Sequence, residues 1–144
     1  MTVDLSYSDH VRDLIARTEQ FIRDEVLPVE DAHGGDITAA GGDAIRADLQ
    51  KAAKAAGVFA PHAPVEYGGH GLNMSDRAPV FEAAGYSLFG PTALNIAAPD
   101  EGNVHMPAHI ASDEQKQQFL APLAAGDVRS AFAMTEPAPG AGAD

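Results

Sequence analysis

The stretch "VRDLIARTEQFIRDEVLP", residues 11–28, decides the fold class because its apolar positions recur at the spacing of an α-helix. Ser6 or Ser8 can cap the first turn, and Pro28 is expected to end the helix because proline lacks an N–H. The sequence therefore predicts a helix with one buried face. That face consists of Val11, Leu14, Ile15, Thr18, Phe21, Ile22 and Val26.

The next part of the chain alternates one more helix with two glycine-containing connections. Residues 45–56 repeat the helical period, and Gly57 follows where a left-handed cap would lie. Before this helix, "HGGDITAAGGD", residues 33–43, is typical of a mobile linker. After it, residues 57–76 hold two prolines and four glycines, which exclude a regular helix or a central strand. We expect a loop there, either ordered or disordered.

Helical signals continue almost to the C-terminus. Ser75 is expected to cap a helix that runs to Leu88, a short alanine-rich helix is expected at residues 92–97, and a further turn or two at 103–110. Ser112 and Gln115 have the spacing of a capping box, which predicts a last helix that Gly126 ends. These signals predict a mainly α domain.

From Arg129 the pattern changes from helical to alternating. Phe132 and Met134 alternate with Ala131, Ala133 and Thr135, as in a β-strand. A lone strand leaves its backbone N–H and C=O groups unpaired, so a sheet supplied by more polypeptide is expected to complete it.

The composition excludes several classes of protein. The 144 residues suffice for one domain, and 9 Lys and Arg against 21 Asp and Glu give a net charge of -12, which argues against nucleic acid and anionic membranes as partners. The absence of cysteine excludes disulfides, thiolate metal sites and a cysteine nucleophile. The N-terminal residues do not form a signal peptide, and no window is apolar enough for a membrane span. We expect a cytoplasmic protein.

Three motifs, in order, resemble those of the acyl-CoA dehydrogenase family. They are "PVEYGGHGLNMSD" at residues 64–76, "SDEQKQQFLAPLAAGDVRSAFAMTEP" at 112–137 and "GAGAD" at 140–144. The stretch "FGPTALNIAAPDEGNVHM", residues 89–106, is similar to the branch of family members 10 and 11. The resemblance implies that residues 1–127 form the helical N-terminal domain. Residues 128–144 would then be the first strand and glycine loop of a β-barrel domain that is otherwise absent.

The same resemblance implies a flavoenzyme that converts acyl-CoA thioesters to enoyl-CoA. In the family a carboxylate base removes the α-proton, a hydride passes to FAD, and an electron-transfer flavoprotein reoxidises the flavin. The base lies in the C-terminal domain, so no catalytic residue is expected in these residues and the isolated chain is expected to be inactive. The implied partners are acyl-CoA, the rest of the dehydrogenase or a homologous subunit, and further copies in a homo-oligomer.

The resemblance also implies ligand-binding residues. The backbone at Met134 and Thr135, with the Thr135 hydroxyl, would bind the flavin ring, and the loop at Gly142 and Ala143 would approach the pyrophosphate. Ala143 stands where the family has serine, so one hydroxyl donor is lost. Residues 93–102 would line the acyl pocket; an alternative is a helix junction packed by alanines. The substrate-binding candidates are Asn95, Ala98 and Asp100.

The sequence also bears on other kinds of site and on a second function. His105 and His109 have the spacing of neighbouring ligands on a helix, but Pro107 lies between them and no third ligand is evident, so no metal site is expected. The chain also lacks the dinucleotide-binding and hydrolase glycine motifs. The alternative function is a non-catalytic helical module that regulates or caps a related dehydrogenase subunit.

Overall fold

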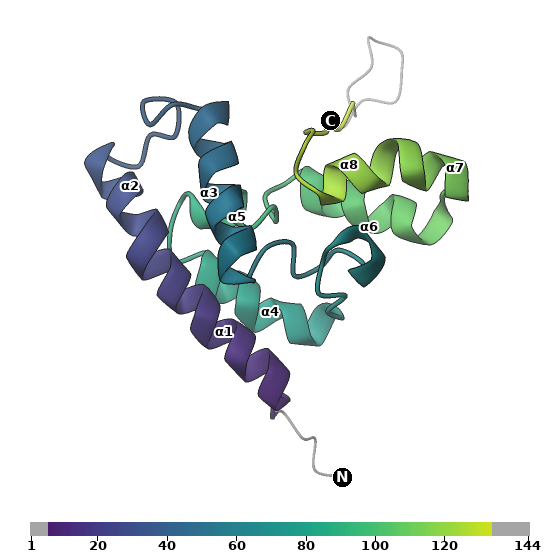
Figure 1. The fold of residues 1–144 in the computed structure, drawn as a ribbon, viewed down its shortest axis with the longest axis horizontal. Helices are drawn as coiled ribbons and strands as arrows, with labels where there is room; N and C mark the ends of the chain where they lie inside the picture. Colours follow the sequence, from purple (N-terminus) through teal and green to yellow (C-terminus); the bar gives the residue numbers. More distant parts are fainter. Residues whose placement is uncertain (1–5, 134–144) are drawn as a thin grey trace, which may run out of the picture.

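The computed structural model describes residues 6–133, which form a bundle of short and medium-length helices (Figure 1). The elements in chain order are α1 (Asp9–Phe21), the π-helical turn η1 (Ile22–Val26), α2 (Leu27–Ala32), α3 (Asp43–Ala56), the 3-10 turn η2 (Val65–Tyr67), α4 (Met74–Ala84), α5 (Gly90–Ala93), α6 (Asp100–Ile110), α7 (Asp113–Gln115), the π-helical turn η3 (Lys116–Leu120) and α8 (Ala121–Ala124).

The first helical segment is longer than the sequence predicts. α1, η1 and α2 continue one another as a single rod along one side of the molecule, and Ser8 caps it by accepting a hydrogen bond from Val11 N at 3.3 Å (Figure 1). The expectation that Pro28 ends the helix is wrong. Leu27 N–H bonds to Ile22 O, five residues back, so the backbone is already widened where the ring of Pro28 enters. This wider turn relieves the clash that proline makes inside a regular α-helix.

The chain uses the same arrangement a second time. Ala121 N–H bonds to Lys116 O at the end of η3, and Pro122 follows immediately. In both places proline comes two residues after a π-helical turn, and the helix continues past it. We conclude that the π-helical turns are the local means by which two prolines are accommodated within helices.

Two helix ends predicted from short sequence signals are confirmed, whereas the helix expected to run to Leu88 ends at Ala84. Gly57 is left-handed, with φ of 66°, at the end of α3. The capping box is present, because Ser112 and Gln115 each accept a backbone N–H of the other. One cap is corrected: Asn73, and not Ser75, begins α4, and its Oδ1 accepts from the backbone N–H groups of Ser75 and Asp76.

Both glycine-containing connections are folded back on themselves by hydrogen bonds. In the first, Gly42 N bonds to Ile37 O at 2.8 Å. In the second, which has the irregular path expected of it, Gly71 N bonds to Ala63 O at 2.9 Å. Ala60 N also bonds to Leu94 O at 2.9 Å, which ties this loop to the segment after α5. The loop is therefore an ordered part of the domain.

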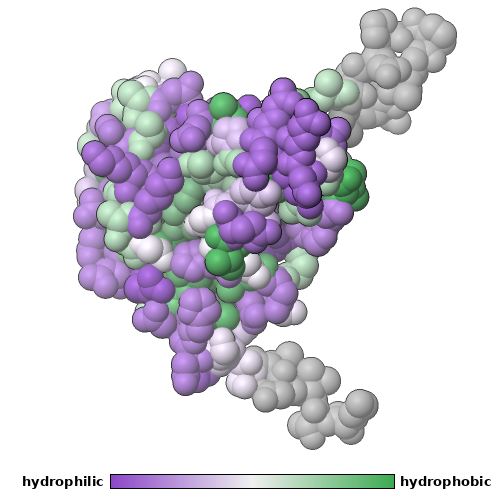
Figure 2. Space-filling view, turned by 45° about the vertical axis from the view of Figure 1, so that its right-hand side comes forward, coloured by the Kyte–Doolittle hydropathy of each residue, from purple (hydrophilic) through white to green (hydrophobic). Residues whose placement is uncertain are grey.

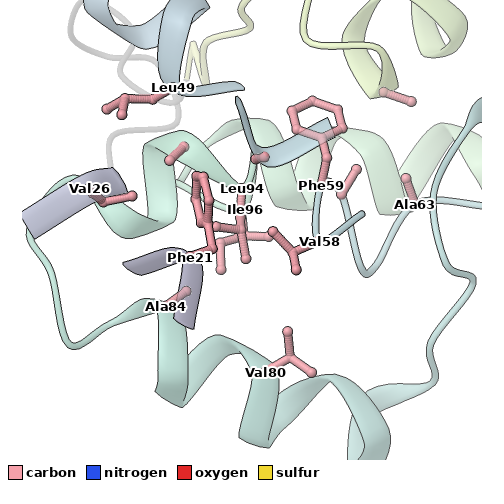
Figure 3. Packing of buried hydrophobic residues seen from close by; sticks show 14 of the residues in the cluster. Phe21, Val26, Leu49, Val58, Phe59, Ala63, Val80, Ala84, Leu94 and Ile96 are labelled. Atoms are coloured by element: carbon pink, nitrogen blue, oxygen red, sulfur yellow. The ribbon is translucent and has the colours of Figure 1, made fainter. Parts of the chain in front are cut away.

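The core lies where the rod, α3, α4 and α5 meet (Figure 3). α1 packs along α4, and α3 packs on α5. Phe21 from the rod, Val80 from α4 and Leu94 beyond α5 each have 3 % or less of their surface exposed. The same core receives Val58, Phe59 and Ala63 from the loop that follows α3.

The C-terminal third differs from the expectation at two helices. The helix expected at residues 92–97 is only the short α5, because Asn95 takes a positive φ of 61° and ends the helical path. The turn or two expected at 103–110 is the complete helix α6. Within 6–133 no strand pairs with residues 129–133, so the strand predicted there, which a sheet from further polypeptide would complete, stays a prediction. The rest of the expected strand and loop, residues 134–144, lies outside the described residues.

Candidate functional site

The predicted substrate-binding residues gather where the segment after α5, the start of α6 and the C-terminal end of the described chain meet. Asn95 lies in the turn after α5, Asp100 is the first residue of α6, and Ser130 comes after α8. Asn95 and Asp100 are buried, with 4 % and 6 % of their surface exposed, while Ala98 between them is exposed. This junction is the candidate functional site.

Asn95 joins three segments of the domain. Its amide Nδ2 donates to Leu123 O at 3.0 Å and Ala124 O at 3.4 Å, both at the end of α8. Gln50 of α3 donates to Thr92 O at 3.1 Å and to Asn95 Oδ1 at 3.5 Å. Because buried amides are costly without partners, these bonds fix the turn after α5 against α3 and α8.

Asp100 holds the end of the described chain. Its Oδ1 accepts from both the backbone N–H and the hydroxyl of Ser130, each at 2.7 Å. Asn103, one turn further along α6, donates to Ser130 Oγ at 2.8 Å, and Arg129 Nε lies 3.7 Å from Asp100 Oδ2. Hydrogen bonds to a carboxylate are about twice as strong as neutral ones. Asp100 therefore sets the position from which the chain leaves the helical body.

An apolar hollow of about 340 Å³ lies beside this exit. Asn103 and Ser130 line it together with residues of α6, η3 and α8. A larger hollow of about 530 Å³, between the rod and α4, contains none of the predicted site residues. The apolar members of the hollow at the exit are Met106, Pro107, Phe119, Pro122, Leu123 and Val128.

His62 is a buried titratable group close to α6. Only 6 % of its surface is exposed, and neither ring nitrogen has a hydrogen-bond partner. Burial, and then the charges of Arg77 and His105, lower the pKa of His62 from its ordinary 6.5 to about 4. Its ring meets the ring of Phe81 edge-on, and Arg77 pairs with Glu101 at 2.9 Å. His62 is therefore neutral in the folded domain near pH 7.

The structure places the other sequence-predicted residues as follows. Met134, Thr135, Gly142 and Ala143 lie outside the described residues, so their predicted flavin contacts stay predictions. The polar groups of Asn95 and Asp100 bond to the domain itself, and their predicted contact with substrate also stays a prediction. His105 and His109 lie side by side on α6 with ring centroids 4.5 Å apart. Within 6–133, no group of three or more His, Cys, Asp or Glu side chains is placed to hold a metal ion.

Sequence reasoning missed the residues that complete the junction. The sequence pattern places Gln50 only in a helix and Ser130 only in a strand, because their partners lie 42 and 30 residues away in the chain. The one available signal was a polar residue on the otherwise apolar face of α3, where Gln50 is buried to 4 % exposure. Among the described residues, no helix is long and apolar enough to cross a lipid bilayer.

We expect Asp100→Ala to release the exit segment while the helices stay folded. The substitution leaves the N–H and hydroxyl of Ser130 without their acceptor, and such charge-assisted bonds contribute about 1.5–3 kcal/mol. The amide of Ser130 should then exchange with deuterium at least about tenfold faster, as followed by NMR. Asp113→Ala, which removes a carboxylate from the first turn of α7, is the matched control. Equal exchange rates in the two variants would show that Asp100 does not hold the exit.

The fold and the junction define a helical domain in which Asp100 holds Ser130, near the end of the described residues. The acyl-CoA dehydrogenase N-terminal domain family matches residues 8–127. The chain is 35 % identical over 138 residues to acyl-CoA dehydrogenase family member 10 of Mus musculus, covering 90 % of this chain and 13 % of that protein. It is 35 % identical over 143 residues to FadE2 of Mycobacterium tuberculosis, described as an acyl-CoA dehydrogenase, covering 94 % and 34 %.

A solved structure shows the same fold. The chain superposes on a structure described as an acyl-CoA dehydrogenase from Mycobacterium abscessus with a TM-score of 0.77 and 40 % identity, over 94 % of this chain and 36 % of that one. The chain thus spans about a third, or less, of the length of these relatives. It belongs to the acyl-CoA dehydrogenase family and comprises the N-terminal helical domain of that family.

Proposed function

We propose that this chain is the N-terminal part of an FAD-dependent acyl-CoA dehydrogenase, which removes two hydrogens from an acyl-CoA thioester to give enoyl-CoA. The observation that carries the proposal is the bonding of Ser130 to Asp100 beside the segment expected to line the acyl pocket. The expected flavin-binding residues begin at Met134, four residues after this fixed point. The helical domain would thus hold the segment that reaches the cofactor next to the segment that reaches the substrate.

The described residues alone do not fit FAD. The hollow at Asn95 and Asp100 holds only about 10 Å³, and the hollow at the exit is mainly apolar, with Arg129 as its single charged lining residue. We therefore place the flavin contacts on Met134, Thr135, Gly142 and Ala143, together with polypeptide that relatives carry beyond this domain. FAD, when bound there, would supply the hydride acceptor, and the base that removes the α-proton would come from the later polypeptide.

The proposed part of this chain in substrate binding is to shape the acyl pocket. The polar groups of Asn95 and Asp100 bond to other parts of the domain. They would therefore set the path of residues 95–100 and would not bind the thioester directly. Ala98 is exposed and small, which leaves space at the surface for an acyl chain. In the complete enzyme we further propose a homo-oligomer in the cytoplasm and an electron-transfer flavoprotein as the oxidant.

The test is the flavin content of the chain alone and in a chimera. Residues 1–144 would be joined to the part of M. tuberculosis FadE2 that lies beyond the matched region. We expect the 144-residue chain to purify colourless. We expect the chimera to carry about one FAD per subunit and to lose its visible flavin band when acyl-CoA is added without oxygen. FAD retained by the isolated chain, or a folded chimera that binds none, would contradict the proposal.

One observation favours the alternative of a non-catalytic module that associates with a dehydrogenase subunit. The described helices build one core from their own residues, from Leu14 in α1 to Ala124 in α8, as a free-standing module would require. On this alternative the isolated chain would bind an intact dehydrogenase subunit without changing its flavin content. Mixing the chain with purified FadE2 and measuring co-elution and flavin content separates the two functions.

A further inference from the structure

Two histidines lie one turn apart on α6 and face solvent. His105 and His109 are both exposed, and the centroids of their rings are 4.5 Å apart. Neither ring makes a hydrogen bond within residues 6–133, so no such bond competes for their nitrogens in that part of the chain. Neutral imidazole is the commonest metal ligand among protein side chains. The pair therefore presents two free ligands side by side.

The course of α6 past Pro107 brings the two histidines to one face. Pro107 lies between them in the sequence, and a proline that broke the helix would separate them. α6 nonetheless runs from Asp100 to Ile110 with Pro107 inside it, and Ala111 N bonds to Pro107 O at 3.1 Å. Side chains four residues apart on a continuous helix are neighbours on its surface. The objection that Pro107 raises against a shared ligand is thus removed.

The distance between the two rings fits a single metal ion. Bonds from imidazole nitrogen to a metal such as zinc are about 2.0–2.1 Å long. Two imidazoles at neighbouring positions of a square-planar or octahedral ion then have ring centres roughly 4.5 Å apart. His105 and His109 already have this separation. Because both side chains are exposed, packing does not prevent either ring from turning a nitrogen toward the ion.

The charge of the domain favours a cation, and the neighbouring side chains leave the ion partly open. The net charge is -12, and Figure 2, which turns the side of α6–α8 forward, shows hydrophilic residues over much of this face. Glu101, one turn before His105, is paired with Arg77 at 2.9 Å. Among residues 6–133 no third His, Cys, Asp or Glu completes a metal-binding group. Water, or a donor from another molecule, would hold the remaining positions of the ion.

We propose that His105 and His109 together bind one divalent ion of the Cu²⁺, Ni²⁺ or Zn²⁺ kind at an exposed two-ligand site on α6. These ions accept imidazole readily, whereas Mg²⁺ and Ca²⁺ prefer oxygen ligands. Cu²⁺ should bind most tightly, because it leads the affinity order of these metals. The site is independent of flavin and of acyl-CoA, so the inference does not rest on the proposed function.

Titration of the 144-residue chain with Cu²⁺ tests the inference. Calorimetry measures the affinity, and electron paramagnetic resonance counts the nitrogens bound to copper. We expect one ion per chain with two coordinating nitrogens. Since the second imidazole binds as part of the same molecule as the first, His105→Gln and His109→Gln should each lower the affinity at least about tenfold. An excess of Mg²⁺ should not displace the copper.

Two control variants separate this pair from the other histidines of the chain. His10→Gln removes one ring of the His10–His70 pair, whose centroids are 6.2 Å apart, and should keep the affinity within about twofold. His109→Gln combined with Ile110→His keeps six histidines in the chain but moves the second ring five residues from His105, off the shared face. Ile110 is 76 % exposed, so the fold should tolerate the change. This double variant should bind as weakly as His109→Gln alone.

The results either support or overturn the site. Loss of affinity in both single variants, with His10→Gln unchanged, supports it. An affinity in His105→Gln equal to that of the original chain overturns it. Recovery of the affinity in the double variant also overturns it, because the number of histidines and not their spacing would then decide binding. Circular dichroism of each variant without metal shows that any loss does not come from unfolding of the helices.

Discussion

Gly90→Ala is expected to destabilise the domain by about 3 kcal/mol or more, at the upper end of what overpacking costs. A Cβ at Gly90 would lie 1.9 Å from Ala84 O and 3.0 Å from Ile22 Cδ1. The first of these atoms is backbone at the end of α4, so no side chain can rotate to make room. α5 would have to move away from α4 and the rod. Thermal or urea unfolding monitored by circular dichroism measures the loss, which corresponds to roughly 10 °C in Tm.

Gly102→Ala is the matched control for this prediction. Gly102 lies inside α6, and its added Cβ would meet only Phe132 Cζ at 3.5 Å, an ordinary contact. Alanine in a helix interior is favoured over glycine by about 0.5–1 kcal/mol, so this variant should be as stable as the original chain or slightly more stable. If both variants unfold at the same temperature, the close approach of α5 to α4 is not as tight as the structure has it.

Stability should fall by about 3 kcal/mol between pH 6.5 and pH 4 because of His62 alone. Burial lowers the pKa of His62 to about 4 in the folded domain, and the unfolded chain keeps the ordinary value of 6.5. Above pH 6.5 both states are neutral there, so the contribution is complete. Between the two values the unfolded chain binds a proton that the folded domain rejects, and each pH unit costs about 1.4 kcal/mol. Below pH 4 both states are protonated and the loss levels off.

His62→Leu isolates this effect from the titration of the carboxylates. Leucine fills the buried space without a titratable ring and removes two nitrogens that have no hydrogen-bond partner. The variant should match the original chain within about 1 kcal/mol at pH 7.5 and exceed its stability by about 2–3 kcal/mol at pH 4.5. His109→Gln, at an exposed position on α6, is the histidine control. Parallel profiles for His62→Leu and the original chain would exclude a depressed pKa at His62.

Burial is the main cause of the lowered pKa of His62, and the charges around the ring add to it. Arg77 of α4 and His105 of α6 are the charged or titratable groups that act on it, and both oppose a positive charge. The nearby carboxylate, Glu101, is already paired with Arg77 at 2.9 Å. A protonated His62 would therefore be buried without an acceptor, which is among the most costly arrangements in a folded protein.

The structures that the sequence predicted well depend on neighbours in the chain. The Ser112–Gln115 capping box and the left-handed Gly57 are decided within a few residues, and both are confirmed. The apolar face of residues 11–26 is likewise a local pattern, and Val11, Leu14 and Phe21 from it are buried. The family could also be predicted from the sequence, because its motifs are short continuous stretches. The family match over residues 8–127 confirms it.

The wrong predictions applied a rule about neighbouring residues where the wider structure changes the outcome. Proline ends a regular helix, but a π-helical turn before Pro28 lets the helix continue, and α1 of the same rod packs on α4. The alternation at residues 129–133 is typical of a strand. A strand requires a paired neighbour, and none lies within the described residues, so that strand stays a prediction and is not among the wrong ones.

By itself, then, the sequence determined the helical class, the family and some of the helix ends, since periodicity, caps and motifs are local properties. The tertiary structure alone decided that Asp100 holds Ser130, that Asn95 joins α8 to the turn after α5, and that His62 is buried without a partner. The reason is physical: a hydrogen bond between residues 30 positions apart, or the loss of water around an imidazole, depends on how the helices pack, and no short stretch of sequence contains that information.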